Sequence, residues 1–252
     1  MDLKLQGRRA LVTGASRGIG LAIARTLADE GCEVLMTARN ASALEQAVTA
    51  LTASSSIAPR ILPADLAYEA ERARVAQWSG EIDILVNNAG DIPPGGIADS
   101  GKLFQDWNLK VFGYVSFCRL IFPKMVARGA GVIANVIGTA GERPDPAYIA
   151  GSMGNAALSA MTRALGLEGL RAGVRVVGVN PGFTSTDRAR MLMEERARTQ
   201  GLESWTDLVN ALPFGRAAAA DEIAAAVAFL VSPRSGYTTG TILTIDGGRS
   251  LM

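Results

Sequence analysis

Short apolar runs alternate with longer helical patterns along the whole chain. Most of the short runs are nearly continuous in valine, isoleucine and leucine, as expected for strands buried on both faces of a sheet. Such alternation indicates a parallel sheet with helices packed on both sides. The predicted strands are Ala10–Thr13, Glu33–Thr37, Arg60–Pro63, Ile82–Val86, Val132–Val136, Val174–Val179 and Ile242–Ile245. The predicted helices are Ile19–Glu30, Ala41–Ala53, Glu69–Ser79, Gly101–Arg128, Tyr148–Ala172 and Asp221–Val231.

The length and hydrophobic content favour one domain. The chain has 252 residues, of which 48% are hydrophobic, and α/β domains reach about 250 residues. No linker, internal repeat or low-complexity tail interrupts the pattern. Met191–Leu212 is richer in polar residues and begins shortly after a Pro-Gly turn. We therefore predict a single doubly wound α/β domain over residues 1–252, with a mobile helical substrate segment near residues 184–212.

Charge and missing residue types exclude several kinds of function. The formal net charge is only +1, which gives no reason to expect a polyanionic partner such as nucleic acid. No apolar run approaches the roughly 18 residues of a membrane span, and the amino terminus lacks the pattern of a secretion signal. Cys32 and Cys118 lack metal-site spacing, as expected for a reduced, cytoplasmic protein without a metal. Because the chain has no histidine, acid–base chemistry must use tyrosine, carboxylates, lysine or water.

A glycine-rich turn follows the first predicted strand. Leu11–Gly20 reads LVTGASRGIG and leads from a strand into a helix. Gly14 permits a tight turn, Gly18 lets the backbone approach a phosphate, and Gly20 lets helix and strand pack closely. The first amide groups of the following helix would point toward a pyrophosphate. The turn in this context predicts a dinucleotide site.

Four motifs in order resemble those of the short-chain dehydrogenase/reductase family. They are TGASRGIG at Thr13–Gly20, NNAG at Asn87–Gly90, NPGFTST at Asn180–Thr186 and GTILTIDGG at Gly240–Gly248, and the resemblance covers essentially the whole chain. It implies a parallel sheet of seven strands in the order 3-2-1-4-5-6-7. It also implies hydride transfer between a nicotinamide cofactor and a carbonyl or alcohol group. Since family members pair their long central helices, we expect a homodimer or homotetramer.

The residues expected around the adenosine ribose favour NADP. In the family an acidic residue after the second strand selects NAD, but here that position is Ala38. Arg39 follows it, and Arg17 lies within the glycine loop. Two guanidinium groups suit a 2′-phosphate, which arginine can bind with its planar fork. If both arginines are merely solvated, NAD is the alternative.

The resemblance assigns further residues to the cofactor. Asp65 matches the residue that hydrogen-bonds the adenine amino group, although an aspartate here could instead cap the following helix. Thr186 matches a residue that contacts the cofactor beside the nicotinamide. The predicted cofactor set is Gly14, Ser16, Arg17, Gly18, Ile19, Gly20, Arg39, Asp65, Leu66, Asn88, Ala89, Gly90, Pro181, Gly182, Thr184 and Thr186.

The family's active site uses an asparagine, a serine, a tyrosine and a lysine. Asn108 matches the asparagine that holds a proton-relay water, or is an ordinary polar residue on a helix. Tyr148 matches the tyrosine that donates the proton. The serine position aligns with Gly138, and Thr139 beside it could offer a hydroxyl if the turn shifts by one residue. The connection from Gly138 to Tyr148 is also shorter than is usual in the family.

The lysine expected one helical turn after Tyr148 is missing. The position four residues on is Ser152, and the related enoyl-reductase spacing leads to Asn155, so neither is basic. In the family this lysine lowers the pKa of the tyrosine and holds the nicotinamide ribose. The resemblance therefore implies an active site in which Ser152 and Gly138 replace the two most important partners of the tyrosine.

Another cation could take over the role of that lysine. Lys110 is a poor candidate, because it lies two residues from Asn108 and so on another face of the predicted helix. Arg143 and Arg188 lie in predicted loops that could approach the cleft. The lysines of the chain are Lys4, Lys102, Lys110 and Lys124.

Three interpretations of Tyr148 remain open. It is the proton donor of a slower carbonyl reduction, a substrate-binding residue, or a remnant in a protein that binds NADP without redox chemistry. The first two predict an NADP-dependent oxidoreductase, and the third predicts a catalytically weak NADP-binding protein. The idiosyncratic segments Asp91–Gly96 and Phe183–Thr206 predict a small, partly apolar substrate that could be anionic. The predicted catalytic set is Tyr148, Asn108, Ser152, Gly138 and Thr139.

Overall fold

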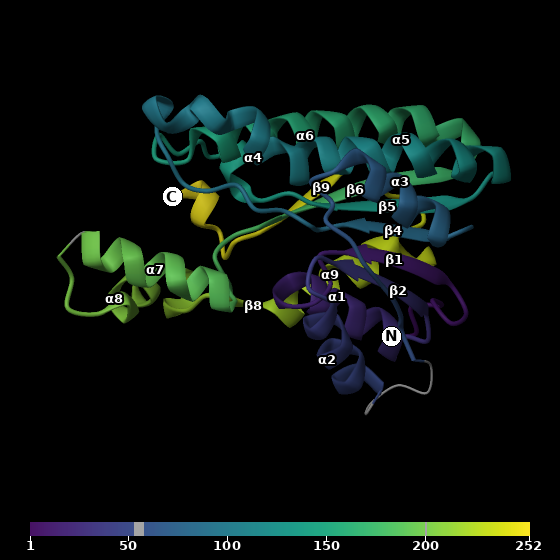
Figure 1. The fold of residues 1–252 in the computed structure, drawn as a ribbon, viewed down its shortest axis with the longest axis horizontal. Helices are drawn as coiled ribbons and strands as arrows, with labels where there is room; N and C mark the ends of the chain where they lie inside the picture. Colours follow the sequence, from purple (N-terminus) through teal and green to yellow (C-terminus); the bar gives the residue numbers. More distant parts are fainter. Residues whose placement is uncertain (53–57, 200) are drawn as a thin grey trace.

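The computed structural model describes residues 1–52, 58–199 and 201–252, in which helices cover both faces of a parallel sheet (Figure 1). The strand order is β3-β2-β1-β4-β5-β6-β9, and every neighbouring pair is parallel. The predicted fold class and strand order are confirmed. The strands are β1 (Arg9–Thr13), β2 (Glu33–Ala38), β3 (Arg60–Pro63), β4 (Ile84–Asn87), β5 (Gly131–Val136), β6 (Val174–Pro181) and β9 (Ile242–Ile245).

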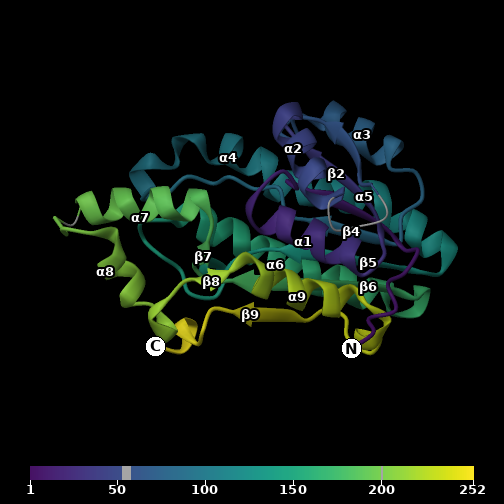
Figure 2. The ribbon, with the colours of Figure 1, turned by 90° about the horizontal axis from the view of Figure 1, so that it is seen from below.

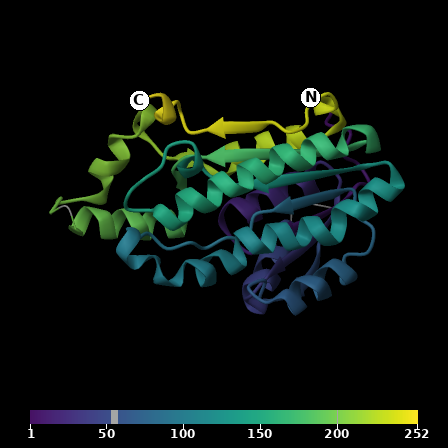
Figure 3. The ribbon, with the colours of Figure 1, turned by 90° about the horizontal axis from the view of Figure 1, so that it is seen from above.

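The helices form two layers, one on each side of the sheet (Figures 1 and 2). One layer holds α1 (Gly18–Asp29), α2 (Ala41–Thr52) and α9 (Ala220–Val231). The other holds α3 (Glu69–Trp78), α5 (Val111–Arg128) and α6 (Ile149–Gly169), with α4 (Leu103–Leu109) leading into α5. Figure 3 shows β9 at one edge, with the two chain ends near its two ends. The predicted end of α2 at Ala53 lies outside the described residues.

Each face of the sheet has its own hydrophobic core, because alternate residues of a strand point to opposite sides. In β1, Ala10 and Val12 pack into the cluster under α1 and α9, whereas Leu11 packs into the cluster under α3 and α5. The strands are therefore apolar on both faces, which is why they read as continuous apolar runs. No helix in the described ranges is long and apolar enough to cross a membrane.

The predicted helix Gly101–Arg128 is interrupted in the structure. α4 ends at Leu109 and α5 begins at Val111, so Lys110 is the junction between two helices. Lys110 itself keeps helical backbone angles, with φ at −86° and ψ at −65°. Its separation from Asn108 by helix face therefore stays a prediction.

The segment predicted to shape the substrate site is helical and projects beyond the sheet (Figure 1). It contains α7 (Asp187–Thr199) and α8 (Trp205–Asn210). Its two ends are held together by the parallel pair β7 (Thr184–Ser185) and β8 (Ala218–Ala219). The predicted helical content near residues 184–212 is therefore present, and the mobility of this segment stays a prediction.

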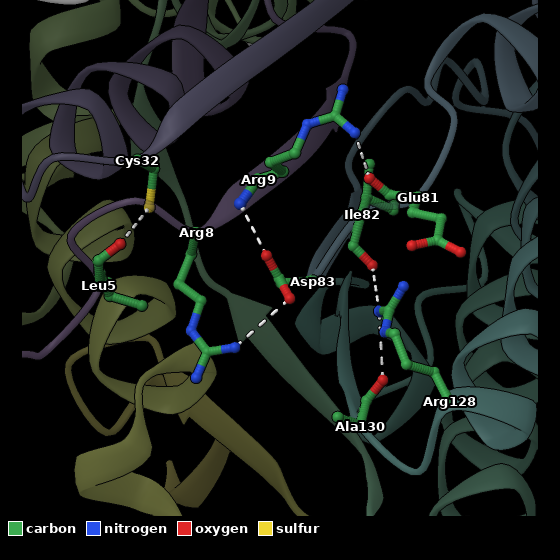
Figure 4. A network of polar contacts seen from close by, with 9 residues as sticks. All are labelled: Leu5, Arg8, Arg9, Cys32, Glu81, Ile82, Asp83, Arg128 and Ala130. Atoms are coloured by element: carbon green, nitrogen blue, oxygen red, sulfur yellow. Dashed lines mark hydrogen bonds and ion pairs between the residues drawn. The ribbon is translucent and has the colours of Figure 1, made fainter.

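Charged side chains tie the amino-terminal ends of the central strands together (Figure 4). The Asp83 carboxylate accepts from the Arg9 backbone N–H at 2.9 Å and from the Arg8 guanidinium at 3.3 Å. Arg128 donates to the carbonyl groups of Ile82 and Ala130 at 2.6 and 3.2 Å. This network leaves the opposite, carboxyl-terminal ends of the strands for the site, where open α/β sheets bind their ligands.

A buried chain of polar side chains joins β4, β5 and α6. The Asn87 amide donates to Asn135 Oδ1 at 2.9 Å, and the Asn135 amide donates to Thr162 Oγ1 at 2.9 Å. Thr162 Oγ1 in turn donates to the Leu158 carbonyl at 2.7 Å. Since Asn87, Asn135 and Thr162 are all fully buried, no water can replace a lost partner without entering the core.

Asn135→Ala is therefore expected to lower the free energy of unfolding by about 2–4 kcal/mol, because it removes two buried hydrogen bonds and leaves their partners unpaired. Urea unfolding followed by circular dichroism measures the change. Asn210→Ala, at the exposed end of α8, is the control and should change stability by less than about 0.5 kcal/mol. Equal effects of the two substitutions would contradict the structural role of Asn135.

Candidate active site

A cleft of about 590 Å³ lies at the carboxyl-terminal ends of the central strands. The glycine loop after β1, the residues after β2 and the NNAG segment after β4 line one part of it. Ile137 and Gly138 after β5, Pro181 and Gly182 in and after β6, and the start of α7 line the rest. The predicted motifs, which are far apart in the sequence, therefore meet around one cavity.

The glycine loop has no room for side chains where it faces the NNAG segment. A Cβ atom at Gly20 would lie 2.3 Å from the Gly14 carbonyl oxygen and 2.4 Å from Asn88 Nδ2. Gly14 and Gly18 have φ angles of 66° and 58°, which favour glycine. Asn88 supports the loop by donating to the carbonyl groups of Thr13 and Gly14 at 2.9 and 3.2 Å. Bare backbone beside a helix amino terminus fits a phosphate-containing cofactor.

Arg17 and Arg39 line the end of the cleft near β2. Both side chains are exposed, and neither has an ion-pair partner in the part of the chain that the structure describes. Ala38, the last residue of β2, also lines the cleft and presents no carboxylate to a ribose. Two unpaired guanidinium groups at this end suit the extra phosphate of NADP.

All but two of the predicted cofactor residues line the cleft. The exceptions are Asp65 and Thr184. Asp65 Oδ1 accepts from the Ala67 N–H at 3.1 Å and so stabilises the turn before α3, but the N-cap residue of that helix is Tyr68 and not Asp65. Thr184 is buried, and its hydroxyl donates to the Gly182 carbonyl at 3.2 Å. A cofactor contact for either side chain stays a prediction.

The predicted catalytic residues are not brought together. Gly138 lines the cleft, whereas Asn108, Thr139, Tyr148 and Ser152 are not among its lining residues, so their catalytic roles stay a prediction. Asn108 is exposed on α4, where its carbonyl accepts from Arg72 Nη1 at 3.1 Å.

The Ser152 side chain is buried and faces the loop before α6. Its Oγ accepts from the Asp145 N–H at 3.1 Å. The Ser152 side chain therefore stabilises this loop rather than binding a ligand in the cleft. Tyr148 immediately precedes α6 and is its N-cap residue. Its carbonyl accepts from the Ser152 N–H at 2.9 Å, so Ser152 lies one helical turn after Tyr148.

The Tyr148 ring lies over Gly151 in a small apolar cluster that also contains Ile92, Val111 and Trp107. A Cβ atom at Gly151 would lie 1.9 Å from the Tyr148 Cζ atom, so the ring fills the space of any side chain at 151. Burial raises the pKa of Tyr148, the charge of Arg188 lowers it, and Asp91 raises it. Burial outweighs the effect of Arg188, so the pKa of the Tyr148 phenol stays above its ordinary value.

Asn155, one turn after Gly151, is the α6 residue that faces Gly138. A Cβ atom at Gly138 would lie 3.0 Å from Asn155 Nδ2. Asn155 is buried, and its Oδ1 has no hydrogen-bond partner among the described residues. The neighbouring Asn180 accepts from the Gly138 N–H at 3.3 Å. The α6 side chain opposite Gly138 is therefore the uncharged amide of Asn155. Ser152 does not occupy this position.

Lys110 is a cleft residue that the sequence did not reveal. Its stem packs against Gly90, where a Cβ atom would lie 2.9 Å from the Lys110 Cδ atom. Its ammonium donates to the Ile137 carbonyl. Burial, and to a smaller extent the charge of Arg188, lowers the pKa of Lys110 to about 8. No pattern in the sequence marks the helix junction that turns this side chain toward the cleft.

Arg188 connects the start of α7 to the segment after β4. Its guanidinium pairs with the Asp91 carboxylate at 2.6 Å and donates to the carbonyl groups of Gly90 and Ile92 at 3.2 Å each. Arg188 and Asp91 both line the cleft. Arg143 instead donates to the Arg249 carbonyl and is not part of the cleft lining.

Comparisons with known proteins agree with the fold. A family model described as enoyl-(acyl carrier protein) reductase matches residues 14–250. The chain is 37% identical to galactitol 2-dehydrogenase (L-tagatose-forming) of Cereibacter sphaeroides, with 97% of this chain and 96% of that protein covered. L-Sorbose reductase from Gluconobacter frateurii, solved with NADPH and L-sorbose, has a TM-score of 0.93 at 29% identity, with both chains covered over 100%. A solved short chain dehydrogenase/reductase family protein has a TM-score of 0.87 at 35% identity, with 99% of this chain and 100% of that one covered.

Proposed function

The chain belongs to the short-chain dehydrogenase/reductase family, and on this basis we propose that it is an NADP-dependent oxidoreductase acting on a carbonyl or alcohol group of a small molecule. One observation carries the proposal: a single cleft joins two arginines without ion-pair partners, the glycine loop and the half-buried Lys110. Similar proteins include a galactitol dehydrogenase and a sorbose reductase solved with NADPH, which supports both the cofactor and a polar, hydroxylated substrate.

The residues of the cleft divide between cofactor and substrate. We assign the pyrophosphate to the backbone of the glycine loop and the 2′-phosphate to Arg17 and Arg39. We assign the nicotinamide end to the neighbourhood of Pro181, Gly182 and Thr186, as the family resemblance implies. NADPH, when bound, would supply the hydride for carbonyl reduction.

The substrate end combines charge with an apolar wall. Lys110 and Arg188 contribute positive charge, whereas Asp91 is paired with Arg188. Ile92 and the Tyr148 ring form the apolar cluster beside this region. These features support a small substrate with an apolar portion and an anionic or strongly polar group.

A second candidate is an NADP-binding protein with little or no turnover. Gly138 offers no hydroxyl, and Asn155 opposite it carries no charge. Tyr148 does not line the cleft. These observations favour an altered reacting centre, and only turnover separates the two candidates.

We also propose a homodimer or homotetramer in a reducing, cytoplasmic environment. Exposed apolar side chains on α5 and α6, including Phe112, Val115 and Leu167, support self-association. Cys32 and Cys118 are buried free thiols, as expected for a protein that needs no disulfide.

The proposed activity is tested by two measurements on the wild-type protein. NADPH binding, followed by quenching of tryptophan fluorescence, is expected to be at least about tenfold tighter than NADH binding, because about 1.4 kcal/mol from the arginine contacts gives that factor. Oxidation of NADPH at 340 nm is then screened with ketoses, keto acids and apolar ketones. Tight NADPH binding without oxidation by any carbonyl, and without NADP reduction by the matching alcohols, would support the second candidate.

A further inference from the structure

Lys110 is a half-buried cation without a carboxylate partner among the described residues. Its one hydrogen-bond partner there is the Ile137 carbonyl, next to Gly138. Burying an ammonium group without a counter-ion is unfavourable, and a methionine could fill the same space against Gly90 without that cost. A function at this position explains why an ammonium group occupies it.

The other side chains of the cleft cannot release a proton at neutral pH. Arg17, Arg39 and Arg188 line it, but guanidinium groups stay protonated in proteins. Asp91 and Asp187 also line it, and ionised carboxylates accept protons only. Tyr148 lies outside the lining, and burial makes its phenol a weaker acid. Lys110 is thus the described cleft residue whose proton is available.

Resting on the proposed function, we infer that Lys110, and not Tyr148, is the catalytic residue that donates the proton in carbonyl reduction. Hydride from the reduced nicotinamide forms the new C–H bond, and the electron pair of the C=O π bond moves to oxygen. That oxygen forms an O–H bond as one N–H bond of the Lys110 ammonium breaks. Lys110 is left as a neutral amine, which solvent protonates again. In the oxidative direction the neutral amine accepts the alcohol proton.

The direction of the pH dependence follows from this role. Reduction needs the ammonium, so its rate should be constant at low pH and fall as the pH rises through about 8. Oxidation needs the amine and should rise over the same range. The charged groups around Lys110 are Arg188 and Asp187 from α7 and Asp91 from the segment after β4, with Arg17 and Arg39 at the far end of the cleft. Arg188 is the one whose charge lowers the pKa of Lys110.

Two substitutions at position 110 test the inference, with Lys102→Met as the matched control. Lys102 is exposed just before α4 and does not line the cleft. Lys110→Met keeps the stem but removes the proton, so kcat for reduction should fall about 10²-fold, the lower range for a placed acid. Lys110→Arg keeps the positive charge but cannot donate a proton. Its kcat for reduction should therefore also be low, and that rate should not decrease above pH 8. Lys102→Met should keep most of the activity and the same pH profile. Tyr148→Phe keeps the apolar ring and should not remove the decrease in rate above pH 8.

A second readout does not depend on turnover. The chain has only four lysines, so ε-carbon NMR signals of labelled lysine can be assigned by the signal that Lys110→Met removes. That signal should titrate near pH 8 and shift when NADP is added.

Different results overturn different statements. If Lys110→Met and Lys110→Arg retain wild-type kcat and pH profile while Tyr148→Phe is inactive, the tyrosine is the acid and the inference fails alone. A Lys110 signal that titrates above pH 10 overturns it as well, with or without activity. If the wild-type protein binds NADPH but reduces no carbonyl, the proposed function fails and the acid role fails with it. Circular dichroism and NADPH binding confirm that each variant is folded.

Discussion

Replacing Gly20 by valine is expected to abolish measurable NADPH binding. The new Cβ atom would lie 2.3 Å from the Gly14 carbonyl oxygen and 2.4 Å from Asn88 Nδ2. Neither group can yield easily, since Gly14 forms the phosphate turn and Asn88 donates to it at 3.2 Å. The turn must therefore open. A loss of about 4 kcal/mol in binding free energy corresponds to about a 10³-fold weaker Kd.

Gly101→Val is the matched control for this substitution. A Cβ atom at Gly101 meets nothing within 4 Å, and the residue is exposed outside the cleft. Fluorescence titration with NADPH should give a wild-type Kd for Gly101→Val. Thermal unfolding of both variants separates loss of the site from loss of the fold. A folded Gly20→Val protein that binds NADPH within tenfold of wild type would contradict the proposed cradle.

Removing both arginines at the β2 end is expected to erase the preference for NADP. Arg17→Ala with Arg39→Ala deletes two charged donors, each contributing about 1–1.5 kcal/mol to an exposed phosphate contact. NADPH should therefore bind about 10²-fold more weakly. NADH, which lacks the 2′-phosphate, should change little, so the ratio of the two Kd values is the informative quantity.

Arg25→Ala on α1 controls for the loss of positive charge. Arg25 is exposed and does not line the cleft. It should leave the ratio of Kd values unchanged, while raising the salt concentration should lower the wild-type ratio because exposed ion pairs are screened. An unchanged ratio in the double variant would show that these arginines do not select the cofactor.

The sheet and the phosphate loop were predictable because local sequence is enough to specify them. Each strand is buried on both faces, so it reads as a continuous apolar run wherever its neighbours lie. The glycine loop needs only a strand, a turn and a helix that are adjacent in the chain. Arg17 and Arg39 follow directly from the ends of β1 and β2, which explains why their position at the cleft could be predicted from spacing alone.

Which side chains lie at the reacting centre depends on where helices begin and where they are interrupted. The sequence carries no clear signal for either kind of boundary. Tyr148 is the N-cap residue of α6, and the Ser152 hydroxyl accepts from the Asp145 N–H, whereas Asn155 faces Gly138. Residue spacing alone could not show this. Lys110 reaches Ile137 because the helix is interrupted there. The sequence by itself determined the fold and the phosphate end of the cleft, since these rest on contacts between chain neighbours and on burial. Only the tertiary structure decided which side chains face Gly138, because that depends on the angle between packed helices.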